Sequence, residues 1–490
     1  MSGDDLELHW LRLADLANLW AESSDAPSHI ALLGEFDAAP LRGVACRLDV
    51  ERVRADLARR VRRAPELGRR IHWTRSGEGR PVWVSDPAFD PLDHIGATTL
   101  PTGADSAAWS ADRIVRRLDP ARPLWRIEIV DALPDGRFGL LIVLHHVVAD
   151  GLTGVAIVGR LLDAFPDATV DATPAPSAGP ALTHRALVTD ARRTRRRAVA
   201  AALRGVPRLP AALRRTARQV RDAAGDIRET APATSLPRRV GTGRRLAVAR
   251  FPLAELRAGG RAVGATVNDV LLSAVSTGLR ELLLARGKSV DGLTLRASMP
   301  VGATGAGQTA AMLLLGLPVG DPDPRQRLVT ITATTTRLKA RQRAGGGDVF
   351  DVLHLPEPLA RAAVRWMRRH AARHINLFVT NVPGPPQPLW LAGARLLEAL
   401  PVAPLAADIP VAIAALSYAG TLTVAVNANA GVSDIDVLAE GIECALAWSA
   451  EVTGHPELTS PSRPARTFDP FRSPRQGGSS RVGWTERGQQ

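Results

Sequence analysis

The segment 138–165, FGLLIVLHHVVADGLTGVAIVGRLLDAF, constrains the fold more than any other stretch of this sequence. Its apolar run before His145 and His146 predicts a buried β-strand. The Asp150-Gly151 pair opens a stretch with an apolar stripe, which predicts a helix directly after the strand. A second Asp-Gly pair just before the segment is typical of a hairpin turn. We therefore expect the strand to pair back on 124–133.

The remainder of 1–165 predicts a mixed α/β lobe. Segment 13–23 has helical spacing, and 80–86 alternates like a strand. Segment 52–71 predicts an amphipathic helix, because apolar residues recur on one side and arginines on the other.

Residues 166–244 differ in composition from the stretches on either side. The first part is rich in Pro, Ala and Ser, as flexible connections are. The Ala/Arg-rich stretch 191–224 favours helix, broken at Pro207 and Pro210. Its basic, weakly apolar character is compatible with an anionic membrane surface or with a solvated crossover between two lobes.

Residues 245–455 predict a second α/β lobe. The pattern favours strands at 245–253, 293–301, 312–319 and 421–430, and helices at 266–287 and 434–452. The apolar stretch 399–418 contains Asp408 and three prolines, so we expect buried strands and turns there and no membrane span. Residues 456–490 have the composition of a disordered tail.

Length and charge limit the possible classes of protein. A chain of 490 residues is too long for one ordinary core, so two domains or one two-lobed domain are expected. Two cysteines and an acidic N-terminus indicate a reducing compartment and no secretory signal. The net charge of +13 suits nucleic acid, an anionic membrane or an anionic cofactor, and it is equally explained by the nucleotide bias of a genome.

The two adjacent histidines are the main candidates for chemistry. Adjacent residues of a strand point to opposite faces, so one imidazole is expected in a cleft and the other inside. A neutral imidazole is the best general base at neutral pH, and its second nitrogen needs a partner, either Asp150 or a backbone carbonyl. Asp150 is placed to cap the helix, and Gly151 to adopt a backbone conformation that other residues resist. No HExxH or paired-cysteine spacing accompanies them, so we expect no metal.

The chain resembles a known family through several motifs in order. HHVVADG (145–151) resembles the HHxxxDG motif of acyl-CoA-dependent acyltransferases, and the chain is most similar to the bacterial wax ester synthase/diacylglycerol acyltransferases. Further resemblances are PLW (123–125), NDVLLSAV (268–275), RASMPV (296–301), LPVGDPDPRQRL (317–328), TNVPGP (380–385) and SYAGTLTVAVNA (417–428). The resemblance runs from about residue 10 to 455.

Three segments depart from the family pattern. APSHIALLGEF (26–36) is a loose version of a Pro-Met-His-x-Gly segment, and Gln308 stands where Asn often follows Gly. NANAGVSDID (427–436) lacks the usual Asp soon after the strand. These departures bear on the acceptor and the level of activity, and they leave the histidine motif intact.

The resemblance implies a fold and a reaction. The fold would be two chloramphenicol-acetyltransferase-like lobes with a central tunnel, comprising 1–165, a crossover at 166–244 and 245–455. The reaction would be transfer of a fatty acyl group from acyl-CoA to a long-chain alcohol or diacylglycerol, which makes wax ester or triacylglycerol. His146 would be the general base, His145 a supporting residue, and Asp150 the residue that holds the loop.

The resemblance also suggests supporting residues. Asn268, followed by Asp269, is expected near the cleft as a polar group for the oxyanion, or else as a helix N-cap. Pro123, Leu124 and Trp125 are expected to pack along the acyl route. Asn381 lies in a predicted rigid turn and either contacts ligand or serves the turn.

Acyl-CoA is expected as a co-substrate, with no cofactor. The enzyme is expected in the cytoplasm with peripheral contact to a membrane or lipid droplet. Two rival functions remain: an enzyme that takes its acyl group from a carrier protein, and a non-enzymatic basic protein. No nucleic acid partner is expected, because aromatic residues that stack on bases are nearly absent from 191–224. Nothing in the sequence indicates the oligomeric state.

Overall fold

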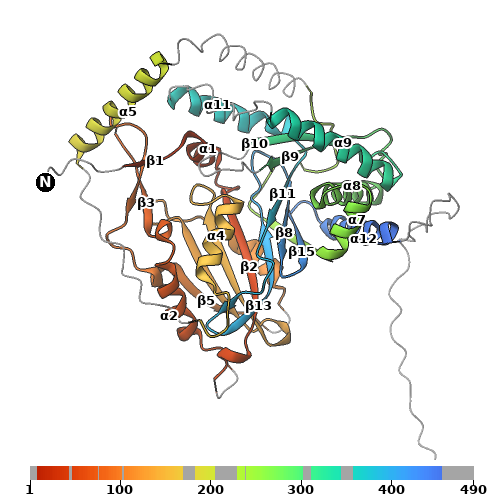
Figure 1. The fold of residues 1–490 in the computed structure, drawn as a ribbon, viewed down its shortest axis with the longest axis horizontal. Coiled ribbons are helices and arrows are strands. Elements are labelled where there is room, and N and C mark those ends of the chain that lie inside the picture. Colours follow the sequence, from red (N-terminus) through yellow and green to blue (C-terminus); the bar gives the residue numbers. More distant parts are fainter. Residues whose placement is uncertain are drawn as a thin grey trace, which may run out of the picture. The chain divides into compact units, whose positions relative to one another are not determined.

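The computed structural model describes residues 8–43, 47–75, 77–101, 104–168, 183–204, 229–237, 239–301, 311–343 and 357–454 (Figure 1). Residues Met1–Gly454 form one compact unit. The predicted tail and about half of the predicted crossover lie outside the described residues. Strands and helices are both abundant, which confirms the predicted mixed α/β class.

The first six-stranded sheet contains the histidine strand. Its order is β12 (Trp390–Leu391), β13 (Ala394–Val402), β2 (His29–Asp37), β7 (Arg137–His145), β6 (Trp125–Asp131) and β5 (Ile95–Thr99). The predicted hairpin between β6 and β7 is confirmed, with Asp135 and Gly136 at φ 58° and 70°. Strand β7 ends at His145, so His146 lies just beyond the sheet.

Helices α2 (Val50–Val61) and α4 (Gly151–Leu161) contribute to the core on one face of this sheet. The prediction of one helix over 52–71 is wrong beyond Val61. Pro65 disfavours the helical conformation for the residue before it, and Ala64 has φ −120° and ψ 79°. The remainder forms a short 3-10 turn and β3 (Arg69–His72), which pairs with β4 (Val82–Ser85), and β4 pairs with β1 (His9–Trp10).

The second six-stranded sheet confirms the strands predicted after residue 245. Its order is β10 (Ala311–Leu317), β9 (Leu295–Val301), β11 (Leu377–Pro383), β14 (Val411–Tyr418), β15 (Thr421–Asn429) and β8 (Arg244–Pro252). Strand β11 runs parallel to both neighbours, and the other pairs are antiparallel. The stretch 399–418 falls on β13 and β14 and the turn between them, as expected.

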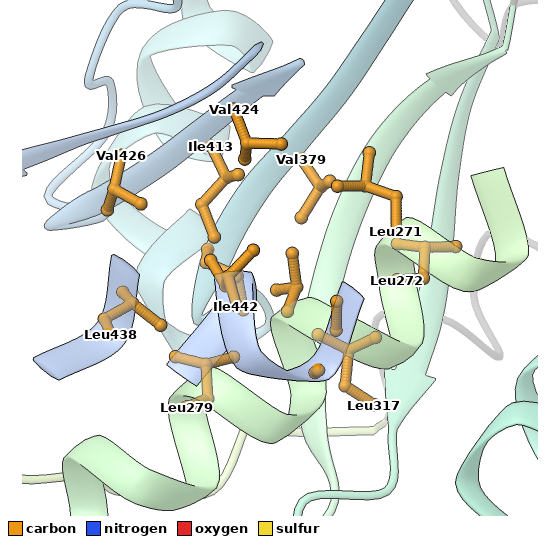
Figure 2. Close-up of a cluster of buried hydrophobic side chains, with 14 of the residues drawn as sticks. Leu271, Leu272, Leu279, Leu317, Val379, Ile413, Val424, Val426, Leu438 and Ile442 are labelled. Carbon is orange, nitrogen blue, oxygen red and sulfur yellow. The ribbon is translucent and has the colours of Figure 1, made fainter. Parts of the chain in front are cut away.

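Helices α7 (Leu253–Ala262), α8 (Val267–Ala285) and α12 (Ile435–Gly454) belong to the core of the second sheet. Figure 2 shows Leu271, Leu279 and Ile442 of the helices directed toward Val379 and Ile413 of the strands. Apolar contact of this kind is the main stabilising term of the lobe.

The two sheets contact each other through a small apolar cluster. Leu33 and Val143 of the first sheet pack with Ala425 of the second. Strands β12 and β13 lie late in the chain, beyond the predicted second-lobe boundary, and yet pair into the first sheet. The predicted domain boundaries stay predictions, but this pairing means that 245–455 contributes to both sheets.

Several helices had no counterpart in the sequence analysis: α3 (Ser106–Ile114), α7, α9 (Pro324–Arg343) and α11 (Glu357–His370). The predicted helix 13–23 is confirmed as α1 (Leu13–Ala21), and α5 (His184–Arg204) covers the first part of the predicted Arg-rich helix. In the described part of the chain, no single helix has the length and apolarity to span a membrane; α7 and α8 meet the criteria only as a pair bent by 97°.

Candidate active site

The side chains of two histidines and one glutamate meet at the end of β7. His29 of β2 is the register partner of His145, and their rings meet edge to face at 5.8 Å. His145 Nε2 lies 3.4 Å from Glu22 Oε2, just after α1. The strands explain this arrangement, because paired residues of neighbouring antiparallel strands carry their side chains on the same face.

His145 is buried, and one of the two histidines was expected to lie inside. It is 2% exposed, and its Nδ1 accepts the backbone N–H of Val147 at 3.0 Å. Because Nδ1 accepts, the neutral ring carries its proton on Nε2 and donates it toward Glu22. Burial alone would raise the pKa of Glu22, but its bond to His145, with the nearby His29 and Arg117, lowers that pKa overall.

His29 is held neutral beside them. It is 4% exposed, and burial lowers its pKa to about 4 despite the bond between Nδ1 and the Ile114 carbonyl oxygen at 2.9 Å. Its Nε2 is buried and has no hydrogen-bond partner in the part of the chain that the structure describes. At neutral pH the cluster therefore holds Glu22 as a carboxylate and His29 as a neutral imidazole.

His146 is less enclosed than His145. Its backbone N–H donates to the Ser28 carbonyl oxygen at 2.7 Å, which fixes the turn after β7. Its Nδ1 lies 3.3 Å from Asn18 Nδ2 on α1. Burial lowers the pKa of His146, and its own backbone carbonyl and the charge of Asp150 act in the opposite direction. A lowered pKa keeps the imidazole neutral, as a base must be.

Asp150 caps α4. Its Oδ1 accepts the Thr153 N–H at 2.8 Å, so it holds the loop as predicted and acts on His146 through its charge. The predicted special conformation of Gly151 is wrong, because its φ is not positive. The glycine is needed for space: a Cβ there would lie 2.8 Å from Val382 Cγ2 of β11.

Pro123, Leu124 and Trp125 are buried beside the histidine strand. The Leu124 carbonyl oxygen accepts the His145 N–H at 3.0 Å. Trp125 donates from Nε1 to the Leu67 carbonyl oxygen at 2.6 Å and stacks on His94 with ring centroids 4.6 Å apart. Their contacts are those of packing residues, and their place along an acyl route stays a prediction.

Asn268 and Asp269 have separate roles. Thr266 caps α8 in a capping box with Asp269, so the alternative of Asn268 as the N-cap is wrong. Asp269 is 2% exposed and also accepts from Thr335 Oγ1 of α9 at 2.6 Å, which makes it structural. Asn268 donates to Met299 Sδ at 3.5 Å, and among the described residues no hydrogen bond joins it to the histidines.

Asn381 lies inside strand β11, so the predicted rigid turn at 380–385 is wrong for its first four residues. They pair in parallel with Ala414–Ser417 of β14. Val382, which directly follows Asn381, lies against the start of α4. This contact brings the second sheet next to the histidine loop.

Asn18, Glu22 and His29 were not identified as site residues from the sequence. His29 falls in the loose Pro-Met-His-x-Gly segment, and that likeness was the available signal for it. Asn18 and Glu22 approach the histidines only because α1 lies against the end of β7, which no local pattern predicts. Among the described residues, no three His, Cys, Asp or Glu side chains gather as metal ligands do.

Comparison with known proteins identifies the family. Residues 11–271 match the wax ester synthase/diacylglycerol acyltransferase catalytic domain, and 306–448 match the C-terminal domain of the same family. A protein of Mycobacterium tuberculosis described as a probable diacylglycerol O-acyltransferase is 31% identical over 455 residues, covering 89% of this chain and 95% of its own.

Solved structures support the fold. The wax ester synthase/diacylglycerol acyltransferase from Marinobacter aquaeolei VT8 is 22% identical, with a TM-score of 0.66, and covers 91% of this chain and 100% of its own. The starter condensation domain of rhizomide synthetase is 14% identical, with a TM-score of 0.55, and covers 91% of this chain and 95% of its own. The chain belongs to the wax ester synthase/diacylglycerol acyltransferase family and is an acyltransferase.

Proposed function

We propose that this enzyme transfers a fatty acyl group from acyl-CoA to diacylglycerol or a long-chain alcohol, with His146 as the general base. The main support is the environment of His146, which lies just past a buried strand. The pKa of its imidazole is lowered, so the ring stays neutral. The relatives described as diacylglycerol O-acyltransferases favour diacylglycerol as the acceptor.

The reaction needs one proton shuttle. His146 Nε2 takes the hydroxyl proton while the hydroxyl oxygen attacks the thioester carbonyl, and a C–O bond forms. The tetrahedral intermediate then expels the CoA thiolate as the C–S bond breaks, and the imidazolium returns its proton to sulfur. A positioned base of this kind contributes roughly 10²–10⁴-fold to the rate. No cofactor takes part.

Asn268 is the proposed donor to the oxyanion of the intermediate. Its amide is bonded to the sulfur of Met299, and a thioether is a weak acceptor. The amide can therefore turn to a stronger acceptor at little cost. A donor to an oxyanion is typically worth about 10²–10³-fold in kcat.

The test of function is release of free thiol from palmitoyl-CoA with purified protein and either diacylglycerol or hexadecanol. We expect acceptor-dependent release that is lost in His146→Ala, a variant whose fold is checked by circular dichroism. The acceptor that works identifies the product. Absence of release with both acceptors, or full release by His146→Ala, would contradict the proposal.

We further propose that the enzyme works at the cytoplasmic surface of a membrane or lipid droplet. Helix α11 supports this location, since Leu359, Trp366 and Met367 are 58%, 49% and 39% exposed. Four arginines share the helix, namely Arg361, Arg365, Arg368 and Arg369. Exposed apolar side chains beside cationic ones are typical of helices that lie on anionic lipid.

Sedimentation with vesicles of anionic phospholipid tests this location. We expect the protein to sediment with them, and Trp366→Ser to bind several-fold more weakly. Equal binding to vesicles of neutral phospholipid would contradict the role of the arginines, and no binding to either would contradict the location.

A further inference from the structure

A cavity with a volume of about 430 Å³ lies outside the histidine cluster, at the edge of the first sheet. It is bounded by the edge strand β5, the beginning of β6, the end of α3 and the loop that joins α3 to β6. Four arginines line it: Arg113, Arg117, Arg122 and Arg126. The carboxylates that line it are Asp93, Asp119 and Glu128.

Two of the arginines hold the walls together. Arg126 donates to the carbonyl oxygens of Arg113 and Arg116, the former by a short bond and the latter at 2.8 Å, so it fixes the end of α3 to β6. Arg113 and Arg126 share one carboxylate, Glu128, at 3.5 and 3.2 Å. The Nε atom of Arg113 is buried without a hydrogen-bond partner among the described residues, whereas the Nε atom of Arg126 faces Glu128. One carboxylate thus faces two guanidinium groups.

The other two arginines are exposed at the mouth of the cavity. Arg122 pairs with Asp93 at 2.8 Å, and both side chains are about half exposed, so the pair is weak. The third carboxylate, Asp119, accepts the Ala121 N–H at 2.9 Å and is part of a turn. Arg117 has no hydrogen bond or ion pair to any described residue. Over the whole lining, four arginines face three carboxylates, so positive charge exceeds negative charge by one.

The cavity adjoins the histidine strand. Pro123 and Trp125 line it, and the residue between them, Leu124, accepts the His145 N–H at 3.0 Å. Arg117 is close enough to the Glu22 carboxylate for its charge to lower that pKa. A molecule held here by an anionic end would have its remainder within reach of the histidine loop.

We propose that this arginine pocket, defined by Arg113, Arg117, Arg122 and Arg126, binds a phosphate-bearing group. A planar guanidinium presents paired donors that match phosphate oxygens, and several guanidinium groups around one hollow suit a dianion. Phosphate of this kind has two sources near a lipid-modifying enzyme: the nucleotide end of coenzyme A and the headgroup of a glycerophospholipid. The pocket is argued from its own residues and does not depend on the acyl-transfer proposal.

Calorimetric titration of the full-length protein tests the pocket. The probes are adenosine 3′,5′-bisphosphate, sn-glycerol 3-phosphate and unphosphorylated adenosine. The variant is Arg117→Glu, and the matched control is Arg116→Glu, which makes the same charge change on the neighbouring residue. Arg116 pairs with Asp112 on the helix surface and does not line the cavity.

We expect one phosphorylated probe to bind, about tenfold more weakly to Arg117→Glu than to the wild type, with little change in Arg116→Glu. The probe that binds identifies the source of the phosphate. If neither phosphorylated probe binds, if adenosine binds as well as its bisphosphate, or if the two variants weaken binding equally, the proposal is overturned. Binding without any acyl transfer in the thiol assay would instead contradict the proposed function and leave the pocket intact.

Discussion

At the scale of single residues, the chemistry depends on which ring nitrogen of His146 carries the proton. For Nε2 to act as a base, Nδ1 must carry the hydrogen and find an acceptor. The backbone carbonyl of His146 is one acceptor. The side chain of Asn18, 3.3 Å from Nδ1, is a second acceptor when its amide is turned so that Oδ1 faces the ring. Rotation of the amide by half a turn exchanges the places of Nδ2 and Oδ1. Asn18 is then a positioning residue that selects the tautomer.

Two substitutions of Asn18 test this role, one through kcat and the other through the pH profile. Asn18→Leu removes an acceptor, and we expect kcat to fall about three- to tenfold, as for one neutral hydrogen bond. Asn18→Asp places a carboxylate beside the ring, which stabilises the imidazolium and raises the pKa of His146. The acid limb of the kcat/KM profile should then move to higher pH. An unmoved limb in Asn18→Asp would mean that Asn18 only fills space.

At the scale of elements, two helices of the second lobe cross at glycines. A Cβ on Gly278 of α8 would lie 2.5 Å from the Leu438 carbonyl oxygen and 2.9 Å from Ile442 Cγ1, both on α12. Gly441 of α12 lies opposite, where a Cβ would be 2.8 Å from the Gly278 Cα. The two backbones therefore approach as closely as glycine allows, and this contact sets the position of α12 over the sheet.

Gly278→Ala should consequently separate the helices. We expect it to lower the free energy of unfolding by about 1–3 kcal/mol, as overpacking does. Gly159→Ala on α4 is the matched control, because nothing lies within 4 Å of its Cβ position and alanine favours helix by about 1 kcal/mol. The measurement is the midpoint of chemical denaturation. A Gly278→Ala midpoint equal to or above that of Gly159→Ala would refute the close crossing.

The contact between α4 and β11 couples the catalytic loop to the second sheet. Gly151→Ala would place its Cβ 2.8 Å from Val382 Cγ2, so either Val382 or the start of α4, together with the histidine loop, would have to shift. We expect kcat to fall by about tenfold or more, since small displacements of catalytic groups are costly. The double variant Gly151→Ala with Val382→Ala should recover most of the loss.

Leu152→Ala is the control for that pair, because Leu152 is the next residue on α4 and is 50% exposed. We expect its kcat to match the wild type. If the double variant is as slow as Gly151→Ala, steric conflict with Val382 is not the cause of the loss.

Elements with strong local patterns were predictable from the sequence. Strand β7, its hairpin and α8 with its Thr266 cap follow from periodicity and turn chemistry alone. Helix α2 was predicted too long, because a helical pattern of apolar residues continued past Pro65. Asn381 was placed in a turn because the Pro-Gly-Pro that follows it dominates the local pattern, whereas pairing with β14 decides its conformation.

At the scale of the whole molecule, the site depends on contacts between distant parts of the chain. His145, His146 and Asp150 were predictable, since they form one contiguous motif. Glu22 and Asn18 precede them by more than 100 residues, and Val382 follows by more than 200. Their proximity requires the order of strands in both sheets, which periodicity does not contain. The arginine pocket could not be predicted from the sequence either. Arginines are common throughout this chain, so the four that line the pocket do not stand out.

Burial of neutral histidines makes the stability of the whole fold depend on pH. The pKa of His29 is about 4 in the folded protein, against the ordinary value of 6.5 in an unfolded chain, so the unfolded chain binds more protons between these values. The free energy of unfolding should therefore be highest above pH 6.5 and fall by up to about 3 kcal/mol as the pH drops toward 4. Glu22, His145 and Arg126 are the charged or titratable groups that act on His29.

His29→Asn isolates this contribution, because an amide can still donate to the Ile114 carbonyl oxygen but does not titrate. We expect denaturation midpoints measured between pH 7.5 and pH 4.5 to fall less steeply in His29→Asn than in the wild type. The slope should not vanish, since burial also lowers the pKa of His94 and His146. Identical slopes in the two proteins would show that the fold does not hold His29 neutral. A second carboxylate, besides Glu22, would then be needed to balance the charge of His29.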